Sequence, residues 1–261
     1  MRLFGMPTLV EIPSLAENAA LCRALGLDFV ELNMNLPQYQ LDELNARELM
    51  QIAQEYGVFF TFHLDENVNV CDFNTYVAQA YVRTVAETIE LAQKIEAPVI
   101  NMHLSSGVYF TLPQRRIYLF EEYQERYLQQ MCAFRAMCEA RIGSSQLRIC
   151  VENCDGFAPF QRRALDELLA SPVFGLTYDV GHNESCGRAD EDYLLAHPEK
   201  LWHMHLHDAT GRKPHLPLGT GEMRLEPLLI LAEKQGCHVV LETKTREGLS
   251  QSVDWLRKKG L

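Results

Sequence analysis

The chain has 261 residues, of which 47% are hydrophobic and 23% are charged, and this is the composition of an ordinary globular protein. Its net charge of −11 disfavours a nucleic acid partner without excluding one, because local charge and bound cations matter more than the sum. We expect no membrane span, because no apolar run reaches the length of a bilayer, and no secretory signal, because the N-terminus lacks an apolar core. The eight cysteines lack paired short spacings apart from Cys150 and Cys154, which predicts reduced thiols and a cytoplasmic location.

The first half of the chain alternates apolar, β-compatible segments with helical patterns. A capping box from Ser14 to Glu17 starts the first helix, and Gly26 and Gly57 are stop signals for the first two helices. We expect strands at residues 2–12, 29–33, 58–63 and 98–103, and helices at 14–25, 45–56 and 74–96.

The second half continues the alternation. We expect strands at residues 147–152, 174–179, 201–208 and 238–242, with residues 180–182 continuing the second of them. Helices are predicted at residues 115–141, 224–235 and 247–259, with a short one before residue 174. Tyr118, Tyr123 and Tyr127 are expected to be partly exposed on the first of these helices, which makes its surface a candidate homodimer contact.

Eight strands that alternate with helices predict a parallel sheet, and eight such units in this length predict a single (β/α)₈ TIM barrel of class α/β. No linker or repeat interrupts the chain, so residues 1–261 are expected to form one domain. An open doubly wound sheet is the alternative. The absence of a glycine-rich phosphate motif after the first strand disfavours a dinucleotide-binding version of it.

The seventh expected strand carries the clearest chemical pattern. His203, His205 and His207 alternate with apolar residues, so that their imidazoles share one face of the strand. Asp208 follows, and then a loop rich in glycine and proline, residues 209–221, which contains His215. A strand that delivers such residues into a loop is typical of the active site of a parallel α/β enzyme.

In a barrel, the carboxyl ends of all eight strands open on one face. The residues collected there are His63, His103, Glu152, Asp179, His182, His205 and Glu242, with His215 nearby. Each alone could be a hydrogen-bonded or ion-paired structural residue, and Glu31 could equally be a salt-bridged strand residue or face a substrate.

Taken together, these groups predict a metal site. The only cations close in sequence are Lys244 and Arg212, so the packed carboxylates would repel one another strongly without a divalent cation. Imidazole and carboxylate ligands without thiolate suit zinc, manganese, iron, cobalt or nickel. We expect the nearby Cys150, Cys154 and Cys186 to be core or loop thiols.

These residues carry a resemblance over the whole chain. The ordered pieces are His63 with Asn69, Asn101-Met-His103, Val151-Glu-Asn153, Tyr178-Asp-Val-Gly-His182, Met204-His-Leu-His-Asp208, Pro217-Leu-Gly-Thr-Gly221 and Leu241-Glu-Thr243. As an ordered set they resemble the xylose isomerase-like TIM-barrel superfamily, which includes sugar phosphate isomerases and epimerases and also endonuclease IV.

The resemblance implies one to three divalent ions, such as zinc, manganese or cobalt. It implies a shared metal site of Glu152, Asp179, His205 and Glu242, and a further zinc held by His63 and His103 with a bridging Glu152. His215 corresponds to a ligand of a third zinc in endonuclease IV, but Lys213 stands where that enzyme has an aspartate. His182 corresponds to a substrate-binding or extra metal-binding histidine. The residues expected at the substrate are Glu31, His63, His103, His182 and His207.

Two reaction classes follow. In the first, a metal polarises the carbonyl of a sugar or sugar phosphate, and Glu152 and Glu242 transfer a proton at the neighbouring carbon as an isomerase or epimerase does. A dehydratase would share that first step. In the second, two metals bridged by Glu152 hydrolyse a phosphoester, as in endonuclease IV. A barrel that binds metal without catalysis is a third reading, which the nearly full ligand set disfavours.

Overall fold

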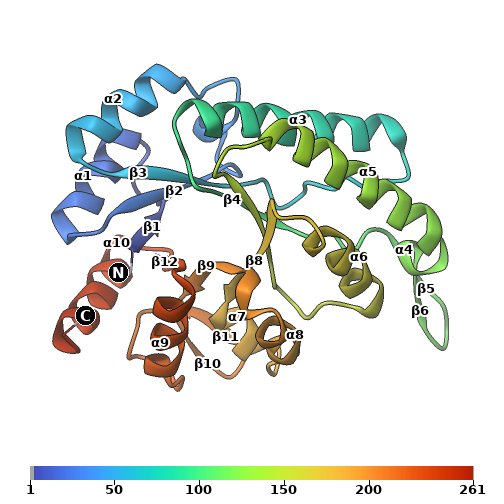
Figure 1. The fold of residues 1–261 in the computed structure, drawn as a ribbon. Coiled ribbons are helices and arrows are strands. Elements are labelled where there is room, and N and C mark those ends of the chain that lie inside the picture. Colours follow the sequence, from blue (N-terminus) through green and yellow to red (C-terminus); the bar gives the residue numbers. More distant parts are fainter. Residues whose placement is uncertain (1–2, 261) are drawn as a thin grey trace.

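The computed structural model describes residues 3–260, within which eight parallel strands close into a barrel with helices around it (Figure 1). Each barrel strand pairs with the next one along the chain, and the last pairs with the first through Leu3 opposite His238. This closure confirms the (β/α)₈ barrel and excludes the open sheet. The barrel strands are β1 (Leu3–Pro7), β2 (Phe29–Asn33), β3 (Phe59–His63), β4 (Val99–His103), β7 (Arg148–Glu152), β8 (Phe174–Asp179), β9 (Leu201–Leu206) and β12 (His238–Leu241).

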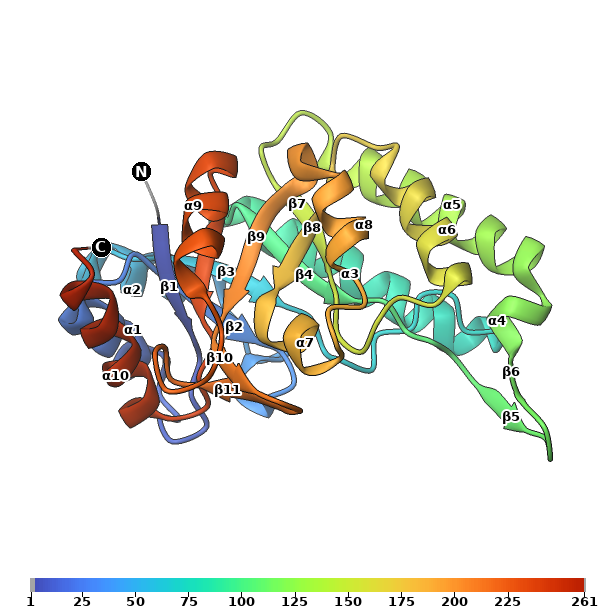
Figure 2. The ribbon, with the colours of Figure 1, turned by 90° about the horizontal axis from the view of Figure 1, so that it is seen from below.

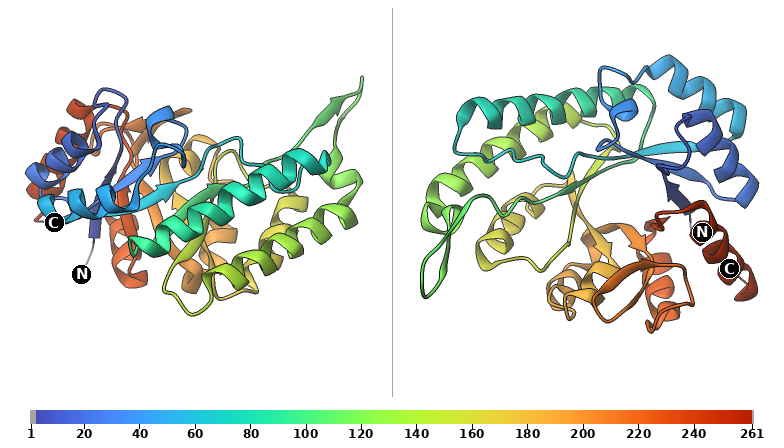
Figure 3. Two further views of the ribbon diagram at one scale, coloured as in Figure 1. Left: turned by 90° about the horizontal axis from the view of Figure 1, so that it is seen from above. Right: turned by 180° about the vertical axis from the view of Figure 1, so that it is seen from behind.

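The helices lie on the outside of the barrel, and both views of Figure 3 show the two longest, α3 and α5, running beside each other. The α-helices are α1 (Leu15–Leu25), α2 (Ala46–Tyr56), α3 (Thr75–Lys94), α4 (Leu119–Glu122), α5 (Gln124–Ile142), α6 (Pro159–Leu169), α7 (Val180–Ser185), α8 (Glu191–Ala196), α9 (Leu225–Gln235) and α10 (Arg246–Lys258). Two 3₁₀ turns, η1 (Pro37–Tyr39) and η2 (Pro198–Lys200), lie between them. Among the described residues, no helix is long and apolar enough to cross a membrane.

Local signals set several helix ends. The Ser14 hydroxyl accepts from the backbone N–H of Glu17, which satisfies one of the free donors at the start of α1. Gly26 and Gly57 end α1 and α2 with φ of 77° and 64°, a conformation that favours glycine. These stop signals are therefore confirmed. The first strand is shorter than predicted, because β1 ends at Pro7; Arg2 lies outside the described residues.

Two small hairpins extend from the barrel. The hairpin of β10 (Asp208–Thr210) and β11 (Lys213–Leu216) occupies much of the stretch expected to be a loop. Residues 180–182, expected to continue a strand, begin α7 instead, because the Asp179 carboxylate caps that helix by accepting from the backbone N–H of His182 at 2.7 Å. Figure 2 shows α7, β10 and β11 gathered at one end of the barrel, and the hairpin of β5 (Tyr109–Thr111) and β6 (Arg116–Tyr118) projecting from the molecule.

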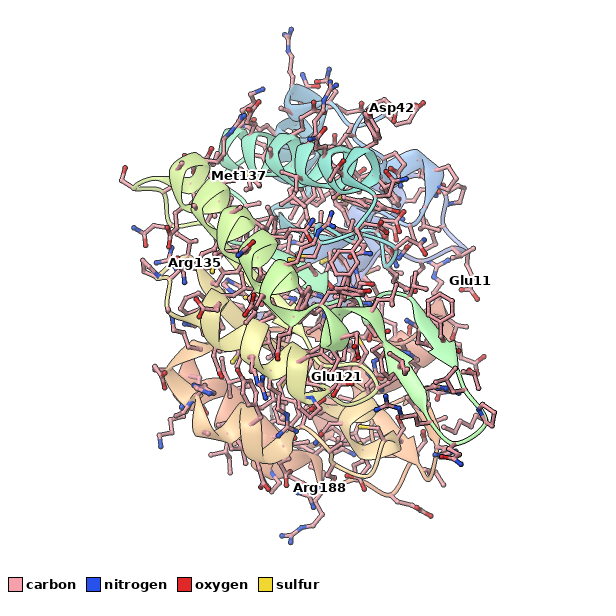
Figure 4. The ribbon with its side chains drawn as sticks, turned by 90° about the vertical axis from the view of Figure 1, so that its right-hand side faces the viewer. Glu11, Asp42, Glu121, Arg135, Met137 and Arg188 are labelled. Carbon is pink, nitrogen blue, oxygen red and sulfur yellow. The ribbon has the colours of Figure 1, made fainter. Side chains whose placement is uncertain are left out.

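The single helix predicted over residues 115–141 is wrong in its first part. Residues 116–118 form strand β6, and the helical segment is divided between α4 and α5. Figure 4 looks onto this region, with Glu121 near the base of the hairpin and Arg135 and Met137 along α5. Tyr123 is exposed as expected, but Tyr127 is fully buried, because its ring stacks on Phe120 with centroids 4.4 Å apart.

Candidate metal centre

Four side chains meet at the carboxyl ends of four neighbouring barrel strands. Glu152 ends β7, Asp179 ends β8, His205 lies in β9 and Glu242 follows β12, and one ligand atom from each lies within 4.8 Å of the others. Nδ1 of His205 is 3.3 Å from Glu152 Oε1, 3.5 Å from Glu242 Oε2 and 3.9 Å from Asp179 Oδ2. The barrel thus brings together the four residues that the resemblance implied for a shared metal site.

The donor set of this cluster fits a divalent cation. All four side chains are buried, and neither Nδ1 of His205 nor Oε2 of Glu242 has a hydrogen-bond partner of normal geometry within the described residues. Three buried carboxylates around one imidazole are costly unless a cation compensates them. Burial acts to raise the pKa of Glu152, but the neighbouring His205 and His103 hold that pKa well below its ordinary value. The charges here therefore favour ionised carboxylates ready to bind a metal ion.

Glu31 lies on the other side of His205. Its Oε1 is 2.8 Å from Nε2 of His205, and its Oε2 is 2.7 Å from Nε2 of His203 and accepts from the Thr61 hydroxyl at 3.2 Å. The 2.8 Å approach of Nε2 of His205 to Glu31 lacks hydrogen-bond geometry, so Glu31 acts on this imidazole as a neighbouring charge. Burial acts to raise the pKa of Glu31, but the imidazoles of His205 and His203 lower it below its ordinary value. This geometry corresponds to the salt-bridged alternative for Glu31.

His63 and His103 approach the second carboxylate oxygen of Glu152, and the His63 ring also stacks on His205 with centroids 5.7 Å apart. Their Nε2 atoms are each 3.3 Å from Glu152 Oε2, whereas His205 faces Oε1. The Nδ1 of His63 is 2.8 Å from the Leu64 carbonyl oxygen, and a proton donated there leaves Nε2 as the free lone pair. Burial acts to lower the pKa of His63, but Glu152 raises it to about 9.

A third group of imidazoles lies beside Asp179. The backbone N–H of His215 donates to Nδ1 of His207 at 2.8 Å, so Nε2 of His207 carries the proton that faces Asp179 at 3.0 Å. His182 contacts Asp179 and His215. Its Nδ1 is 3.2 Å from Asp179 Oδ2, and its Nε2 is 3.1 Å from Nε2 of His215. Burial lowers the pKa of His215 to about 4, which favours a neutral ring. His182 and His215 therefore lie beside Asp179 and each other, and their roles stay predictions, while His207 is fully buried against Asp179.

The loop that carries His215 is held by Asp208. The Asp208 carboxylate accepts backbone hydrogen bonds from Gly219 at 3.0 Å, Gly221 at 2.9 Å and Met223 at 3.1 Å. His215 itself has a φ of 59°, which is uncommon for a residue with a side chain and is found where surrounding contacts fix the backbone. These contacts fix the position of the His215 ring over the centre.

One neighbour of the centre, Cys154, was not identified as a ligand candidate by sequence analysis. Cys154, expected to be a loop thiol, lies with His103 and Glu152 in a group whose ligand atoms are all within 4.8 Å of one another. Burial, followed by the charges of Glu152 and Asp179, raises its pKa well above the ordinary value. Cys154 lies in the bend that follows β7, two residues after Glu152, and this closeness in sequence to a strand-end glutamate was the available signal.

The surroundings of the centre include a cation and a cavity. Nζ of Lys244 is 2.9 Å from Glu242 Oε1. This oxygen of Glu242 is therefore ion-paired, while the other, Oε2, faces His205. A cavity of about 110 Å³ adjoins Glu152. It is lined by Leu104, Ser106, Glu152, Cys154, Asp155 and Phe157, among others.

A family model for xylose isomerase-like TIM barrels matches residues 19–259. Among curated proteins, an uncharacterized protein of Methanocaldococcus jannaschii is 22% identical over 178 residues, which cover 67% of this chain and 66% of that protein. The matched region thus spans just under two thirds of that relative.

Solved structures share the fold along the whole chain. A D-tagatose 3-epimerase-like protein superposes with a TM-score of 0.79 at 21% identity, covering 99% of this chain and 96% of the other. The 3-keto-D-glucoside 4-epimerase of E. coli gives 0.78 at 15% identity, with 99% and 100% covered. An L-ribulose 3-epimerase gives 0.73 at 16% identity, with 100% and 95% covered. At these identities the likeness shows the fold.

Proposed function

Because the chain belongs to the xylose isomerase-like TIM barrel family, we propose that it is a divalent-metal-dependent sugar or sugar-phosphate isomerase or epimerase. The observation that carries this proposal is the placement of two glutamates at one cluster. Glu152 Oε1 and Glu242 Oε2 both face Nδ1 of His205, from strand ends separated by β8 and β9. Solved structures with the same fold include three sugar epimerases or epimerase-like proteins, which supports the substrate class.

The chemistry requires a proton to leave and return at a carbon next to a carbonyl. A divalent cation bound by Glu152, Asp179, His205 and Glu242 would polarise that carbonyl and make the neighbouring C–H more acidic. Glu152 and Glu242 then serve as the acid and base, one removing the proton and the other returning one. Return from the opposite side of the carbon inverts it, and this gives an epimerase.

The surrounding residues have supporting roles in this proposal. His182 lies at the rim with its side chain partly exposed, where it can hold a substrate hydroxyl. Glu31 orients His205, and His207 orients Asp179, since each contacts its partner while being buried from solvent. The ion pair with Lys244 and the contact with His205 keep the Glu242 carboxylate in place.

The direct test is solvent deuterium exchange. The metal-loaded protein should incorporate deuterium from D₂O at the carbon beside the carbonyl of a ketose or its phosphate, as measured by NMR. Glu152→Gln and Glu242→Gln should each lower this rate by about 10² or more, since general acid–base catalysis contributes at least that factor. Glu222→Gln, an exposed carboxylate on the same loop side, is the matched control.

Normal exchange in both glutamine variants would remove these residues from the mechanism. Exchange without accumulation of an epimer, together with loss of water from a keto acid, would indicate a dehydratase, which shares the first step. No exchange with any carbonyl substrate at full metal loading would contradict the proposal.

Phosphoester hydrolysis is the second candidate. It is favoured by the approach of His63 and His103 to Glu152 Oε2, because a single metal on the four-residue cluster does not need both imidazoles. The net charge of −11 disfavours a DNA substrate, although it does not exclude one. Release of phosphate or cleavage of abasic DNA by the zinc-loaded protein would select this candidate.

The remaining parts of the proposal concern the setting of the enzyme. The partner is a small carbohydrate, and the cysteines, which are all free thiols, agree with a cytoplasmic location. A homodimer through the aromatic segment near Arg115 stays a prediction, for which sedimentation of the purified protein is the check.

A further inference from the structure

We propose that the chain forms a twofold dimer through its projecting β5–β6 hairpin, residues 108–118, here named the arm. The partner that fits the arm is a second copy of this chain. This inference rests on the homodimer part of the proposed function, for which it names the interface, and it does not depend on the proposed reaction.

One face of the arm carries an apolar stripe. Val108, Phe110 and Leu112 alternate along the extended backbone around β5, so their side chains share a face of the hairpin. These three side chains are 59%, 57% and 46% exposed. Ile117 on β6 pairs directly with Phe110 and belongs to the same face. An exposed apolar face on a free sheet edge is a site of association.

The arm has no covering layer of its own. Within the described residues, β5 and β6 pair only with each other, and Figure 2 shows them projecting from the molecule. A two-stranded hairpin by itself is marginally stable in water, because it needs further strands or a packed face. The face opposite the stripe is partly occupied, since the Tyr109 ring contacts that of Tyr118 at 5.5 Å and the guanidinium of Arg116 at 4.6 Å. The apolar stripe is the face left open.

The exposed apolar surface continues at the base of the arm. Tyr76 and Val77 at the start of α3 are 84% and 37% exposed, and Tyr123 between α4 and α5 is 57% exposed. Phe73 connects the two places, because its ring contacts those of Tyr123 at 5.9 Å and Phe120 at 5.2 Å. Figure 1 shows α4 and the arm at the same end of the molecule.

The area of this surface is that of a dimer contact. Of the eleven large hydrophobic side chains that are exposed in the described structure, seven lie on the arm or at its base. With about 150–200 Å² for each such side chain when fully exposed, their exposed fractions correspond to on the order of 700 Å². A standard interface buries about 800 Å² on each partner. Scattered apolar residues need no partner, whereas a continuous surface of this size marks an interaction site.

The distribution of charge makes the surface complementary to its own copy. The charged residues of the arm are Arg115 and Arg116 at its tip, and Glu121, Glu122 and Glu125 follow at its base. None of these five has an ion-pair partner among the residues that the structure describes. In a twofold dimer with antiparallel arms, the tip of each arm lies at the base of the other, which brings the arginines to the glutamates. This attraction offsets the repulsion between two chains of net charge −11.

The test is sedimentation equilibrium of the full chain without metal or substrate. Wild type should be a dimer, and Phe110→Asp should raise the dimer Kd by about 10² or more, because the change occurs twice in a twofold interface. Ile230→Asp is the matched control, since Ile230 is 65% exposed on α9, and it should remain dimeric. Circular dichroism checks that each variant is folded.

Charge reversal tests the antiparallel orientation. Arg115→Glu together with Arg116→Glu should raise the dimer Kd by about 10-fold or more, because like charges then meet at each end of the interface. Adding Glu121→Arg and Glu122→Arg should restore the dimer. A dimer that the first pair of changes leaves intact, or that the second pair does not restore, would reject this orientation.

The remaining outcomes separate the arm from the other parts of the proposal. A wild type that is monomeric at about 100 µM, weaker than interfaces of this size bind, would overturn the homodimer and leave a different protein as the occupant of the arm. A wild-type dimer that Phe110→Asp does not weaken would keep the homodimer and reject the arm. A mass that rises beyond two copies with concentration would reject the closed twofold arrangement. A dimer weakened by Phe110→Asp, from a protein that exchanges no deuterium into any ketose, would reject the proposed reaction and support the arm interface.

Discussion

Glu31 shows how one buried residue can control a metal ligand without touching the metal. The residue is 1% exposed, and its two oxygens contact Nε2 of His205 at 2.8 Å and Nε2 of His203 at 2.7 Å. A glutamate packed against the distal nitrogen of a ligating histidine restrains the position of the imidazole ring. The residue is therefore a positioning residue in the proposed enzyme.

Glu31→Gln should accordingly weaken metal binding by about 10- to 100-fold, the usual effect of losing such a partner. Isothermal titration calorimetry with Mn²⁺ measures this, and Glu43→Gln, an exposed glutamate, is the control. Unchanged affinity in a folded Glu31→Gln protein would mean that His205 does not depend on Glu31.

Protonation of the imidazoles of His63 and His205 predicts how metal affinity depends on pH. Burial acts to lower the pKa values of His63 and His205, but Glu152 raises that of His63 to about 9 and that of His205 well above its ordinary value. A ligating imidazole must lose its proton, so metal affinity should rise as the pH increases from about 6.5 towards 9. The contribution of these protonated rings to the stability of the metal-free fold has the opposite sign: it is complete below pH 6.5 and is lost as the pH rises through 9.

The measurement is the apparent dissociation constant for Zn²⁺ or Mn²⁺ at several pH values, with protons released counted from calorimetry in two buffers. An affinity that does not change over this range would show that the imidazoles are already neutral in the metal-free protein.

At the scale of elements, α7 is the piece that brings His182 to the centre. Its packing depends on Gly181, because an added Cβ would lie 2.1 Å from the ring of His207. Gly181→Ala should therefore displace α7 or His207, costing about 1–3 kcal/mol of stability and lowering metal affinity as well. Gly248→Ala in α10, where the nearest atoms are 3.2 Å away, is the control.

Chemical denaturation measures the stability of the two glycine variants, and metal titration measures their metal affinity. Gly181→Ala with normal stability and normal metal binding would show that α7 tolerates a shift without disturbing the site.

The helix ends and the segment before α5 show which structural predictions from the sequence were right and which were wrong. Gly26 and Gly57 were correctly read as helix stops, since a left-handed residue is a local requirement that glycine meets. Residues 116–118 were wrongly read as helix, because their strand conformation depends on pairing with residues 109–111. Tyr127 was wrongly placed at the surface, because only the neighbouring Phe120 and Phe160 rings bury it.

At the scale of the whole molecule, the candidate metal links four barrel strands. Glu152, Asp179, His205 and Glu242 come from β7, β8, β9 and the end of β12, so a bound ion joins separate units of the barrel. A ligand that binds only the folded state at 100 times its dissociation constant stabilises it by about 2.7 kcal/mol. Metal should therefore raise Tm by roughly 5–10 °C for a domain of this size.

Differential scanning calorimetry with and without EDTA measures this shift. The metal-induced rise in Tm should be much smaller in Asp179→Asn. For this variant too, Tm is measured with and without metal. An equal shift in wild type and Asp179→Asn would place the stabilising ion elsewhere.

The sequence by itself determined the barrel and the side of it that carries the chemistry. Strand periodicity is local, and parallel strands end on one face, so histidines and carboxylates at strand ends must converge there. His63, Glu152 and Asp179 were each identified from this reasoning, and the structure brings them to the same face.

Only the tertiary structure decided which atoms meet. Glu31 and His203 are 172 residues apart in sequence, and their contact depends on the closure of β1 onto β12. The grouping of Cys154 with His103, and the turn of His207 towards Asp179, depend on distances of a few ångströms between strands that local patterns do not encode. Ligand geometry is a property of the packed barrel, because the orientation of each side chain is fixed by neighbours distant in sequence.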